Sequence, residues 1–235
     1  MTTDRSGLAP LQAYLNIPEV VIKRLPIYAR VLNELLESGA TVVSSSDLAL
    51  ATGSTAAQIR RDLSYFGEFG KQGKGYDVVH LLEAIREILN VNEQYRVVVV
   101  GAGSLGQAIA RYEGFRHNGF LLSWVYDHNP ERIGKRLSDD MMVEDVAHMA
   151  ERVRNEGVKI AILAVPASAA QDVTETLVEA GVKAILNYAP VVLRVPDDVR
   201  VYDIDPVAAL QSLTYYLSPT LPRSRGNRSN SSLNS

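Results

Sequence analysis

Hydrophobic residues in the first part of the chain recur at helical spacing. From residue 18 onward they stand three or four apart, which predicts one buried helical stripe. These positions are Val21, Leu25, Tyr28, Leu32 and Leu35. Asn16-Ile17-Pro18 is typical of a helix start, and Ser38-Gly39 of a helix end. Pro26 is expected to kink or split this helix, because proline lacks the backbone N–H.

Two short helices are expected next, the first of them apolar, and a turn that contains glycine separates them. Ser44–Asp47 offers caps for the first helix, and Thr52-Gly53 ends it. Ser54 or Thr55 caps the second helix, which covers residues 56–66. Two short helices joined in this way predict a helix-turn-helix.

The second of these helices has an apolar and a polar face. Ile59, Leu63 and Phe66 are expected to pack inward. The polar side chains suit base edges and phosphates in a DNA major groove. The candidate DNA-binding residues are Ser45, at the start of the first helix, and five residues of the second helix: Gln58, Arg60, Arg61, Ser64 and Tyr65. The alternative is an ordinary small domain with a solvated basic face.

A glycine-rich segment, residues 68–76, follows directly and resembles a hairpin with Lys71 and Lys74 at its tip. A hairpin after a recognition helix forms a wing that contacts DNA, so both lysines are candidate DNA-binding residues. Residues 54–76 carry four cationic and two acidic side chains, on a chain whose net charge is −3. This local basic surface favours nucleic-acid binding. Asp77 is expected to cap a last helix over residues 78–90.

From residue 96 onward, short apolar strands alternate with helices, which predicts a parallel sheet covered on both faces. The expected strands cover residues 96–100, 121–126, 141–143, 159–165, 183–187 and 199–203. The expected helices cover residues 107–112, 144–155, 167–180 and 205–217. The sequence therefore predicts an α/β chain with a winged helix-turn-helix domain and a Rossmann doubly wound sheet. The predicted divisions are a flexible N-terminus (1–15), the winged helix (16–90), the Rossmann domain (95–217) with its terminal helix (205–217), and a disordered tail (218–235).

A glycine-rich motif lies between the first strand and its helix. Gly101-Ala102-Gly103-Ser104-Leu105-Gly106 matches the G-x-G-x-x-G of dinucleotide-binding domains. Gly101 permits the tight turn, Gly103 lets the backbone approach a pyrophosphate, and Gly106 allows close helix–strand packing. The pyrophosphate is expected at the helix N-terminus, where unpaired N–H groups favour an anion.

Asp127 ends the second strand, where an acidic side chain binds the adenosine ribose hydroxyls and repels a 2′-phosphate. NAD(H) is therefore expected in preference to NADP(H). The alternative is a surface aspartate at a strand end. Two later loops are candidate contacts of the nicotinamide half, although either could be only a strand end stopped by proline. These loops supply Val165, Pro166, Tyr188, Ala189 and Pro190.

Composition excludes several classes of protein. The chain has 235 residues, of which 46% are hydrophobic and 22% charged, as in globular proteins. The absence of cysteine excludes disulfides and thiol redox switching, and four scattered histidines predict no metal site. The chain contains no run of about 18 apolar residues, which is the length needed to span a membrane. The N-terminus lacks an apolar export signal, so a cytoplasmic location is expected.

Several motifs together resemble the family of redox-sensing transcriptional repressors named Rex. They are Ile17-Pro18-Glu19, Lys23-Arg24-Leu25-Pro26, the run from Gln58 to Gly70, Gly101–Gly106, Ile185–Pro190 and Leu210–Leu213. The resemblance covers about residues 15–217. It implies that the protein is a regulator and not an enzyme. It also implies a homodimer that binds palindromic operator DNA when NADH is scarce and dissociates from this DNA when NADH binds.

The resemblance also implies a polar switch and an exchange of the terminal helix between subunits, beside the partner's nicotinamide pocket. Asp205 would pair with Arg30 in the DNA-competent state and with Tyr112 when NADH is bound. Each of these residues could instead have an ordinary surface or capping role. Pro206 stands where many members have an aromatic residue, so stacking on the nicotinamide must come from another side chain.

The rival interpretation is an NAD-dependent oxidoreductase with an accessory helical domain. Such an enzyme needs an acid or base near the nicotinamide and a substrate pocket. Tyr188 is the nearest candidate, without an evident basic partner, and residues 1–90 leave no room for a substrate domain.

Overall fold

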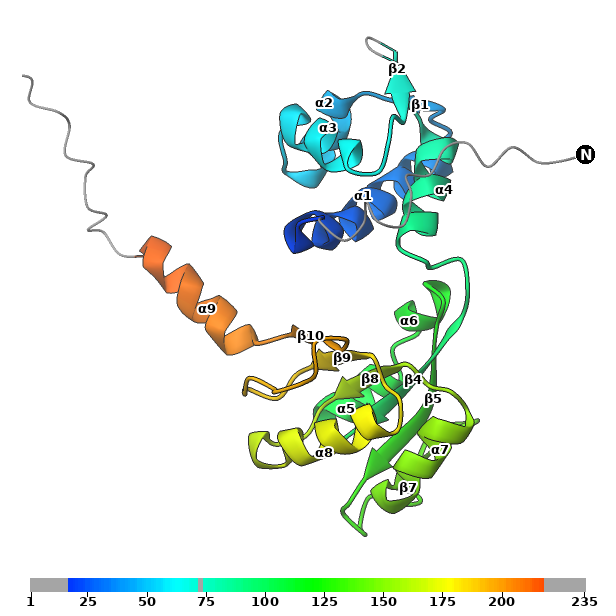
Figure 1. The fold of residues 1–235 in the computed structure, drawn as a ribbon, viewed down its shortest axis with the longest axis vertical. Helices are drawn as coiled ribbons and strands as arrows, with labels where there is room; N and C mark the ends of the chain where they lie inside the picture. Colours follow the sequence, from blue (N-terminus) through cyan, green and yellow to red (C-terminus); the bar gives the residue numbers. More distant parts are fainter. Residues whose placement is uncertain (1–16, 72–73, 218–235) are drawn as a thin grey trace, which may run out of the picture. The chain divides into compact units, whose positions relative to one another are not determined.

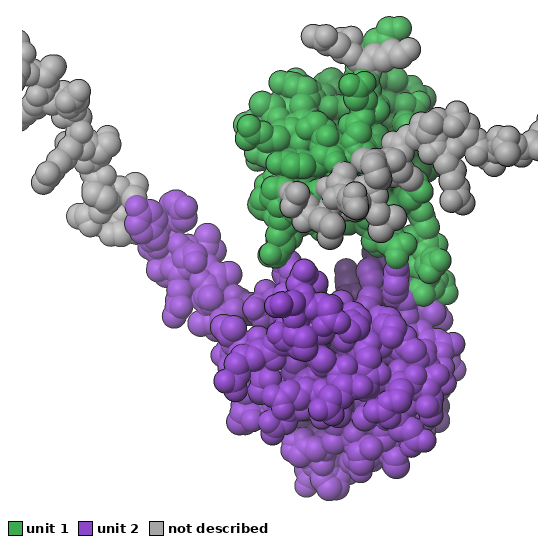
Figure 2. All heavy atoms as spheres, in the orientation of Figure 1, with its two compact units in different colours: residues 1–94 green, residues 95–235 purple. Residues whose placement is uncertain are grey.

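The computed structural model describes residues 17–71 and 74–217, and for Lys71 only the backbone. The chain divides into two compact units, residues 1–94 and 95–235 (Figure 2). Each unit has its own hydrophobic core. Asn16, with the predicted flexible N-terminus (1–15) and tail (218–235), lies outside the described residues.

The first unit is a winged helix-turn-helix, which confirms the predicted fold class (Figure 1). Its helices are α1 (Glu19–Glu37), α2 (Ser45–Thr52), α3 (Ala56–Ser64) and α4 (Val78–Ile88). A small antiparallel sheet has the order β1-β3-β2. Its strands are β1 (Val42–Val43), β2 (Gly70–Lys71) and β3 (Gly75–Asp77). Apolar residues of all four helices form the core, including the fully buried Leu25, Leu48, Ile59 and Leu81.

The turn between α2 and α3 is encoded locally. Ser44 and Asp47 form a capping box in which each side chain accepts the other's backbone N–H. Gly53 ends α2 with φ +66°, in the left-handed region that favours glycine. Thr55 then caps α3 by accepting the N–H of Gln58 at 3.1 Å. These side chains fix where each helix begins and ends.

Pro26 was expected to kink or split the first helix, and the split is wrong, because α1 runs through this proline from Glu19 to Glu37. Pro26 is exposed, and the buried residues on both sides of it pack on the same core. Packing of this apolar face therefore outweighs the one hydrogen bond that proline cannot donate.

The second unit is built on a seven-stranded sheet of order β10-β9-β8-β4-β5-β7-β6, parallel except where β6 pairs with β7. The strands are β4 (Tyr95–Val100), β5 (Phe120–Asp127), β6 (Arg136–Ser138), β7 (Met141–Asp145), β8 (Ile160–Leu163), β9 (Ala184–Asn187) and β10 (Arg200–Asp203). The helices are α5 (Ser104–Ala110), α6 (Gly114–His117), α7 (Met149–Asn155), α8 (Ala167–Glu179) and α9 (Pro206–Thr214). Short 3₁₀ turns cover Val146–His148 and Tyr215–Leu217. The predicted Rossmann sheet is thus confirmed.

Alternate residues of the central strand point to opposite faces of this sheet. Val98 and Val100 of β4 pack under α7 and α8, whereas Val97 and Val99 face the side of α5 and α6. The sheet is therefore buried on both faces, and its carboxyl ends meet at one edge.

Several sequence-based boundaries differ from the structure. The helix expected over 107–112 begins at Ser104, inside the glycine motif, and ends at Ala110. The helix expected over 144–155 begins only at Met149, because residues 144–145 belong to β7 and pair with the end of β5. Asp145 then ends the strand by accepting the N–H of Ala147 at 2.9 Å. Strand β6 had no counterpart in the prediction.

Candidate DNA-binding and dinucleotide-binding sites

A buried carboxylate fixes the recognition helix α3 against α1. Asp62 is fully buried, and Arg24 binds it with both nitrogens of its guanidinium edge, at 2.6 and 2.7 Å. The Tyr28 hydroxyl donates to the same carboxylate at 2.6 Å. Gln58 Nε2 completes the cluster with a hydrogen bond of 2.7 Å. The bonds from Arg24 and Tyr28 thus hold α3 against α1, and the bond from Gln58 lies within α3.

The charges of this cluster are set by those hydrogen bonds. Burial by itself raises the pKa of the Asp62 carboxyl, but the hydrogen bonds from Arg24, Tyr28 and Gln58 outweigh it and leave the pKa below its ordinary value. Burial, with the hydrogen bond to Asp62, raises the pKa of Tyr28 to about 12. Asp62 is therefore ionised at neutral pH, and Tyr28 stays protonated and donates.

The charge of Asp62 by itself predicts an exposed side chain, although the sequence also carries a signal for its burial. Asp62 follows Ile59 by three positions and precedes Phe66 by four, so it lies on the apolar stripe of α3. Gln58 also differs from the expectation of an outward side chain, because it is half-buried and engaged with Asp62.

Three of the eight predicted DNA-binding residues line a hollow of about 880 Å³ between α2, α3 and the wing. Ser45, Arg60 and Ser64 line it, with Gly70 and Tyr76 of the wing opposite. Arg60 Nη1 donates to Ser45 Oγ at 3.0 Å, which holds this arginine across the start of α2. Arg61, Tyr65 and Lys74 are exposed nearby in the chain, and Lys71 lies on β2.

The glycine motif connects β4 to α5 in the geometry that a dinucleotide needs. Gly101 has φ +99°, and a Cβ there would lie 2.3 Å from the Ala164 carbonyl oxygen. A Cβ on Gly106 would lie 1.7 Å from the Gly101 carbonyl oxygen. At Gly103 the space is open, since the nearest atom, Arg132 Nη1, is 4.0 Å from a Cβ position. The backbone at Gly103 is thus free to approach a pyrophosphate, and the loop fits this ligand.

Asp127 lies beside this loop at the end of β5. Its carboxylate accepts the backbone N–H of Ala102 at 2.7 Å and that of Asn129 at 2.8 Å, and it pairs with Arg132 at 3.0 Å. His128 Nδ1 lies 3.5 Å from the same carboxylate. Burial raises the pKa of Asp127, but the two backbone hydrogen bonds and Arg132 outweigh it, so the pKa lies below its usual value. A fixed anion therefore stands where the ribose of a dinucleotide is expected.

The two other predicted loops lie at the same edge of the sheet. Tyr188 N–H donates to the Leu163 carbonyl and Ala164 N–H to the Val100 carbonyl, which joins the ends of β4, β8 and β9. Val165 and Tyr188 are half-buried there, Ala189 is buried, and the two prolines, Pro166 and Pro190, are exposed.

Asn187 shapes the second of these loops and was quoted in the sequence analysis only as part of a motif. Its side chain is fully buried. Nδ2 donates to the carbonyls of Ala189 and Val191 and, at 2.8 Å, to Asp203 of β10, while Oδ1 accepts the N–H of Ala189. This amide ties the loop after β9 to the neighbouring strand.

The three predicted switch residues lie on different elements. Asp205 caps α9 by accepting the N–H groups of Val207 and Ala208 at 2.9 and 3.0 Å. Tyr112 follows α5 and is 65% exposed, with its ring edge-to-face on Phe115. Arg30 is exposed on α1, in the other unit. All three side chains are accessible.

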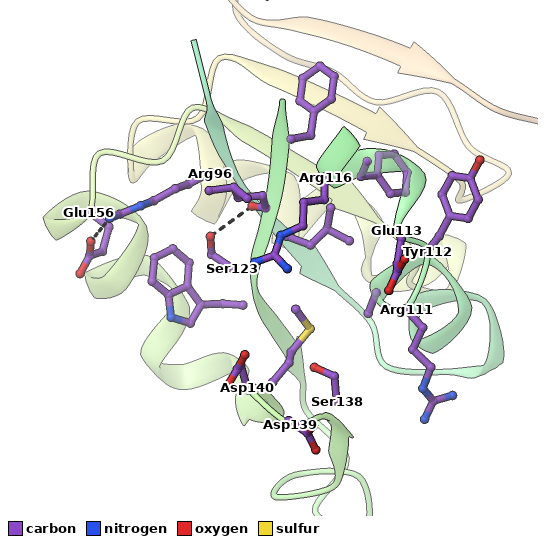
Figure 3. Close-up of a pocket in the computed structure, with 17 residues that line it drawn as sticks. Arg96, Arg111, Tyr112, Glu113, Arg116, Ser123, Ser138, Asp139, Asp140 and Glu156 are labelled. Atoms are coloured by element: carbon purple, nitrogen blue, oxygen red, sulfur yellow. Dashed lines mark hydrogen bonds and ion pairs between the residues drawn. The ribbon is translucent and has the colours of Figure 1, made fainter. Parts of the chain in front are cut away.

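Tyr112 also lines a second hollow, of about 720 Å³, at the other end of β5 from Asp127 (Figure 3). Its wall includes residues 120–124, the half of β5 that β7 does not pair. An ion pair between Arg96 and Glu156 closes one side. This hollow contains none of the predicted cofactor-binding residues.

Two kinds of feature are absent from residues 17–71 and 74–217, the part of the chain that the structure describes. No helix there is long and apolar enough to cross a membrane. No cluster of three or more histidine, aspartate or glutamate side chains there could hold a metal ion.

A winged helix-turn-helix followed by a Rossmann domain with an open glycine motif defines a DNA-binding protein of the ligand-responsive class. Two family models match: "Putative DNA-binding protein N-terminus" over residues 16–64, and "CoA binding domain" over residues 92–191. The redox-sensing transcriptional repressor Rex of Chloroflexus aggregans is 57% identical over 201 residues, which is 86% of this chain and 94% of the relative. The Rex repressor of Roseiflexus sp. is 53% identical over 89% of this chain and 95% of its own length.

Solved structures agree with these relatives. A crystal structure of RSP in complex with β-NAD⁺ and operator DNA is 40% identical, with a TM-score of 0.81 over 86% of this chain and 92% of that chain. RSP in complex with β-NADH is 38% identical, with a TM-score of 0.77 over 86% of this chain and 94% of that chain. The chain belongs to the redox-sensing transcriptional repressor Rex family, and the resemblance inferred from the sequence is confirmed.

Proposed function

We propose that this chain is a transcriptional repressor that binds operator DNA and responds to the NADH/NAD⁺ ratio. The observation that carries the proposal is the likeness over 86% of the chain to a protein solved with both β-NAD⁺ and operator DNA. The relatives are named as redox-sensing transcriptional repressors. We therefore propose a regulator rather than an oxidoreductase, acting in the cytoplasm, where a repressor reaches the chromosome.

The DNA-binding surface is the exposed side of α3 together with the wing. Arg60 and Arg61 supply guanidinium groups for guanine edges or phosphates, and Lys74 supplies an ammonium group at the wing. Ser45 and Ser64 offer hydroxyls at the rim of the same hollow. The Asp62 cluster sets the position of α3, on which these contacts depend.

The dinucleotide lies across the carboxyl ends of β4, β5, β8 and β9. Asp127 binds the adenosine ribose, the backbone at Gly103 faces the pyrophosphate, and the loops after β8 and β9 surround the nicotinamide. The nucleotide acts as a regulatory ligand, since its nicotinamide is neutral when reduced and cationic when oxidised. An apolar, closed pocket favours the neutral form, because the cation loses its hydration there.

The repressor acts as a homodimer in which α9 packs on the partner subunit. Support comes from α9 itself, whose residues are all exposed while its apolar side chains include Val207, Leu210 and Leu213. A solitary helix with such a face gains stability only by covering it. We propose that closure of two Rossmann domains around NADH moves Asp205 from Arg30 to Tyr112 and changes the separation of the two recognition helices. Palindromic half-sites demand a fixed separation, so a modest rotation lowers the affinity.

Arg60→Ala tests the proposed DNA interface. It removes one base or phosphate contact, so the affinity for a palindromic operator should fall about tenfold or more. Fluorescence anisotropy of a labelled operator at fixed salt measures this. Arg154→Ala is the matched control, because Arg154 is exposed on α7 in the other unit. Equal affinities of the two variants would contradict the interface.

A further inference from the structure

We infer that Arg132 is the cationic half of a 2′-phosphate site that Asp127 keeps closed, so that these two residues together decide which dinucleotide the protein accepts. The inference rests on the proposed binding of a dinucleotide at the glycine motif. It goes beyond the role of Asp127 as a ribose ligand, because it assigns Arg132 a part in the selection between NAD(H) and NADP(H).

A tight turn after β5 carries Arg132 back over the glycine motif. Asn129 Oδ1 accepts the N–H of Glu131 at 2.9 Å, and the N–H of Arg132 donates to the Asn129 carbonyl at 2.9 Å. Arg132 Nη1 thereby lies 3.0 Å from Asp127 Oδ2, and 4.0 Å from where a Cβ on Gly103 would be. The guanidinium thus lies beside both the ribose carboxylate and the loop that receives the pyrophosphate.

The Asp127 carboxylate forms an ion pair with the Arg132 guanidinium and neutralises its charge. Asp127 Oδ2 accepts from both Ala102 N–H and Arg132, while Oδ1 accepts from Asn129 N–H. Because Asp127 is only 3% exposed, its hydrogen bonds are held within the protein rather than shared with water. A ribose hydroxyl can still approach as a donor, whereas a 2′-phosphate meets a fixed, buried anion.

Dinucleotide sites use an acidic residue for the 2′-hydroxyl or an arginine for the 2′-phosphate, and this chain places both side by side. Without the carboxylate, the Arg132 fork would be free to bind a phosphate in a bidentate manner, with His128 adjacent. The competing explanation is that Arg132 only holds Asp127 in place. These two explanations differ in what happens once Asp127 is gone.

The test compares NADPH and NADH binding, by isothermal titration calorimetry, to the full chain and three variants. Asp127→Ser should bind NADPH at least about tenfold more tightly than the unaltered protein does, and NADH more weakly. Adding Arg132→Gln should abolish the gain in NADPH affinity. Adding Arg136→Gln instead should preserve it, since Arg136 is an exposed arginine on the neighbouring β6.

A gain that is the same with and without Arg132 overturns the inference, and so does a folded Asp127→Ser protein that gains nothing. Thermal melting followed by circular dichroism establishes that each variant is folded. Should Asp127→Ser fail to fold, Asp127→Asn allows the same comparison, because its amide oxygen can still accept the Ala102 N–H. Failure of the unaltered protein to bind NADH would instead refute the proposed function, so the two failures are distinguishable.

Discussion

Asp62 shows what a single buried residue does for the DNA-binding unit. Its carboxylate receives hydrogen bonds from Arg24, Tyr28 and Gln58, and the first of these residues is 38 positions away in the chain. The cluster joins α1 to the recognition helix through charged groups rather than through apolar contact alone. These hydrogen bonds fix the orientation of α3 relative to α1, because each donor binds a particular carboxylate oxygen of Asp62.

Asp62→Asn should lower the free energy of unfolding by about 3 kcal/mol, since it leaves the Arg24 guanidinium without its anion. Urea denaturation at pH 7 measures this. Arg61→Gln, an exposed change on the same helix, should cost less than about 0.5 kcal/mol. A loss for Asp62→Asn no larger than that of the control would contradict the structural role.

The same residue predicts an effect of pH. Because the folded pKa of Asp62 lies below its ordinary value, its contribution to stability is complete above the unfolded pKa of about 3.9 and is lost as the pH falls toward the folded pKa. Asp62→Asn should therefore show a smaller loss of stability between about pH 5 and pH 2 than the unaltered protein. Identical acid dependence in both proteins would count against the ionised cluster.

Asp205 allows the proposed switch to be separated from helix capping. Asparagine caps helices about as well as aspartate does, so Asp205→Asn should keep α9 intact while removing the charge that pairs with Arg30. Operator binding should weaken, and NADH should release the DNA less effectively, as measured by anisotropy. Normal NADH-induced release from this variant would rule out the switch.

Residue-level features were predictable where the signal is local. The caps at Ser44 and Thr55 and the glycine motif follow from short stretches of sequence. The pairing of Asp62 with Arg24 and the role of Asn187 at β10 depend on partners far along the chain, which no local pattern contains. The fold and the motifs could therefore be predicted from the sequence, whereas the side chains that position the motifs could not.

At the scale of elements, the mismatches have a common cause. The helix α1 continues through Pro26, and residues 144–145 extend β7 rather than begin a helix. In both cases packing or strand pairing with a distant element overrides the local preference. Strand β6 is only three residues long and pairs antiparallel with β7, so its pattern is too short to predict.

The exposed helix α9 gives the prediction that belongs to this scale. Leu210→Glu combined with Leu213→Glu should raise the dimer dissociation constant at least about hundredfold, because two leucines lose an apolar partner surface. Sedimentation velocity measures the monomer fraction. Gln211→Glu, on the same helix, should leave the dimer unchanged. A dimer that persists in the double variant would show that α9 does not form the interface.

At the scale of the whole molecule, the chain joins two units of different chemistry. One presents exposed cationic side chains on a recognition helix, and the other presents an anion beside an open glycine loop. A ligand shifts a conformational equilibrium only if it binds the two states with different affinities. Redox sensing therefore requires that NADH and NAD⁺ differ in their effect on DNA binding, and not merely that both bind.

The most direct test is fluorescence anisotropy of a labelled palindromic operator with the full-length protein at fixed salt, titrated separately with NADH and NAD⁺. We predict that NADH releases the operator at concentrations where NAD⁺ has little effect. Equal release by the two nucleotides, or tight operator binding that neither of them changes, would contradict it.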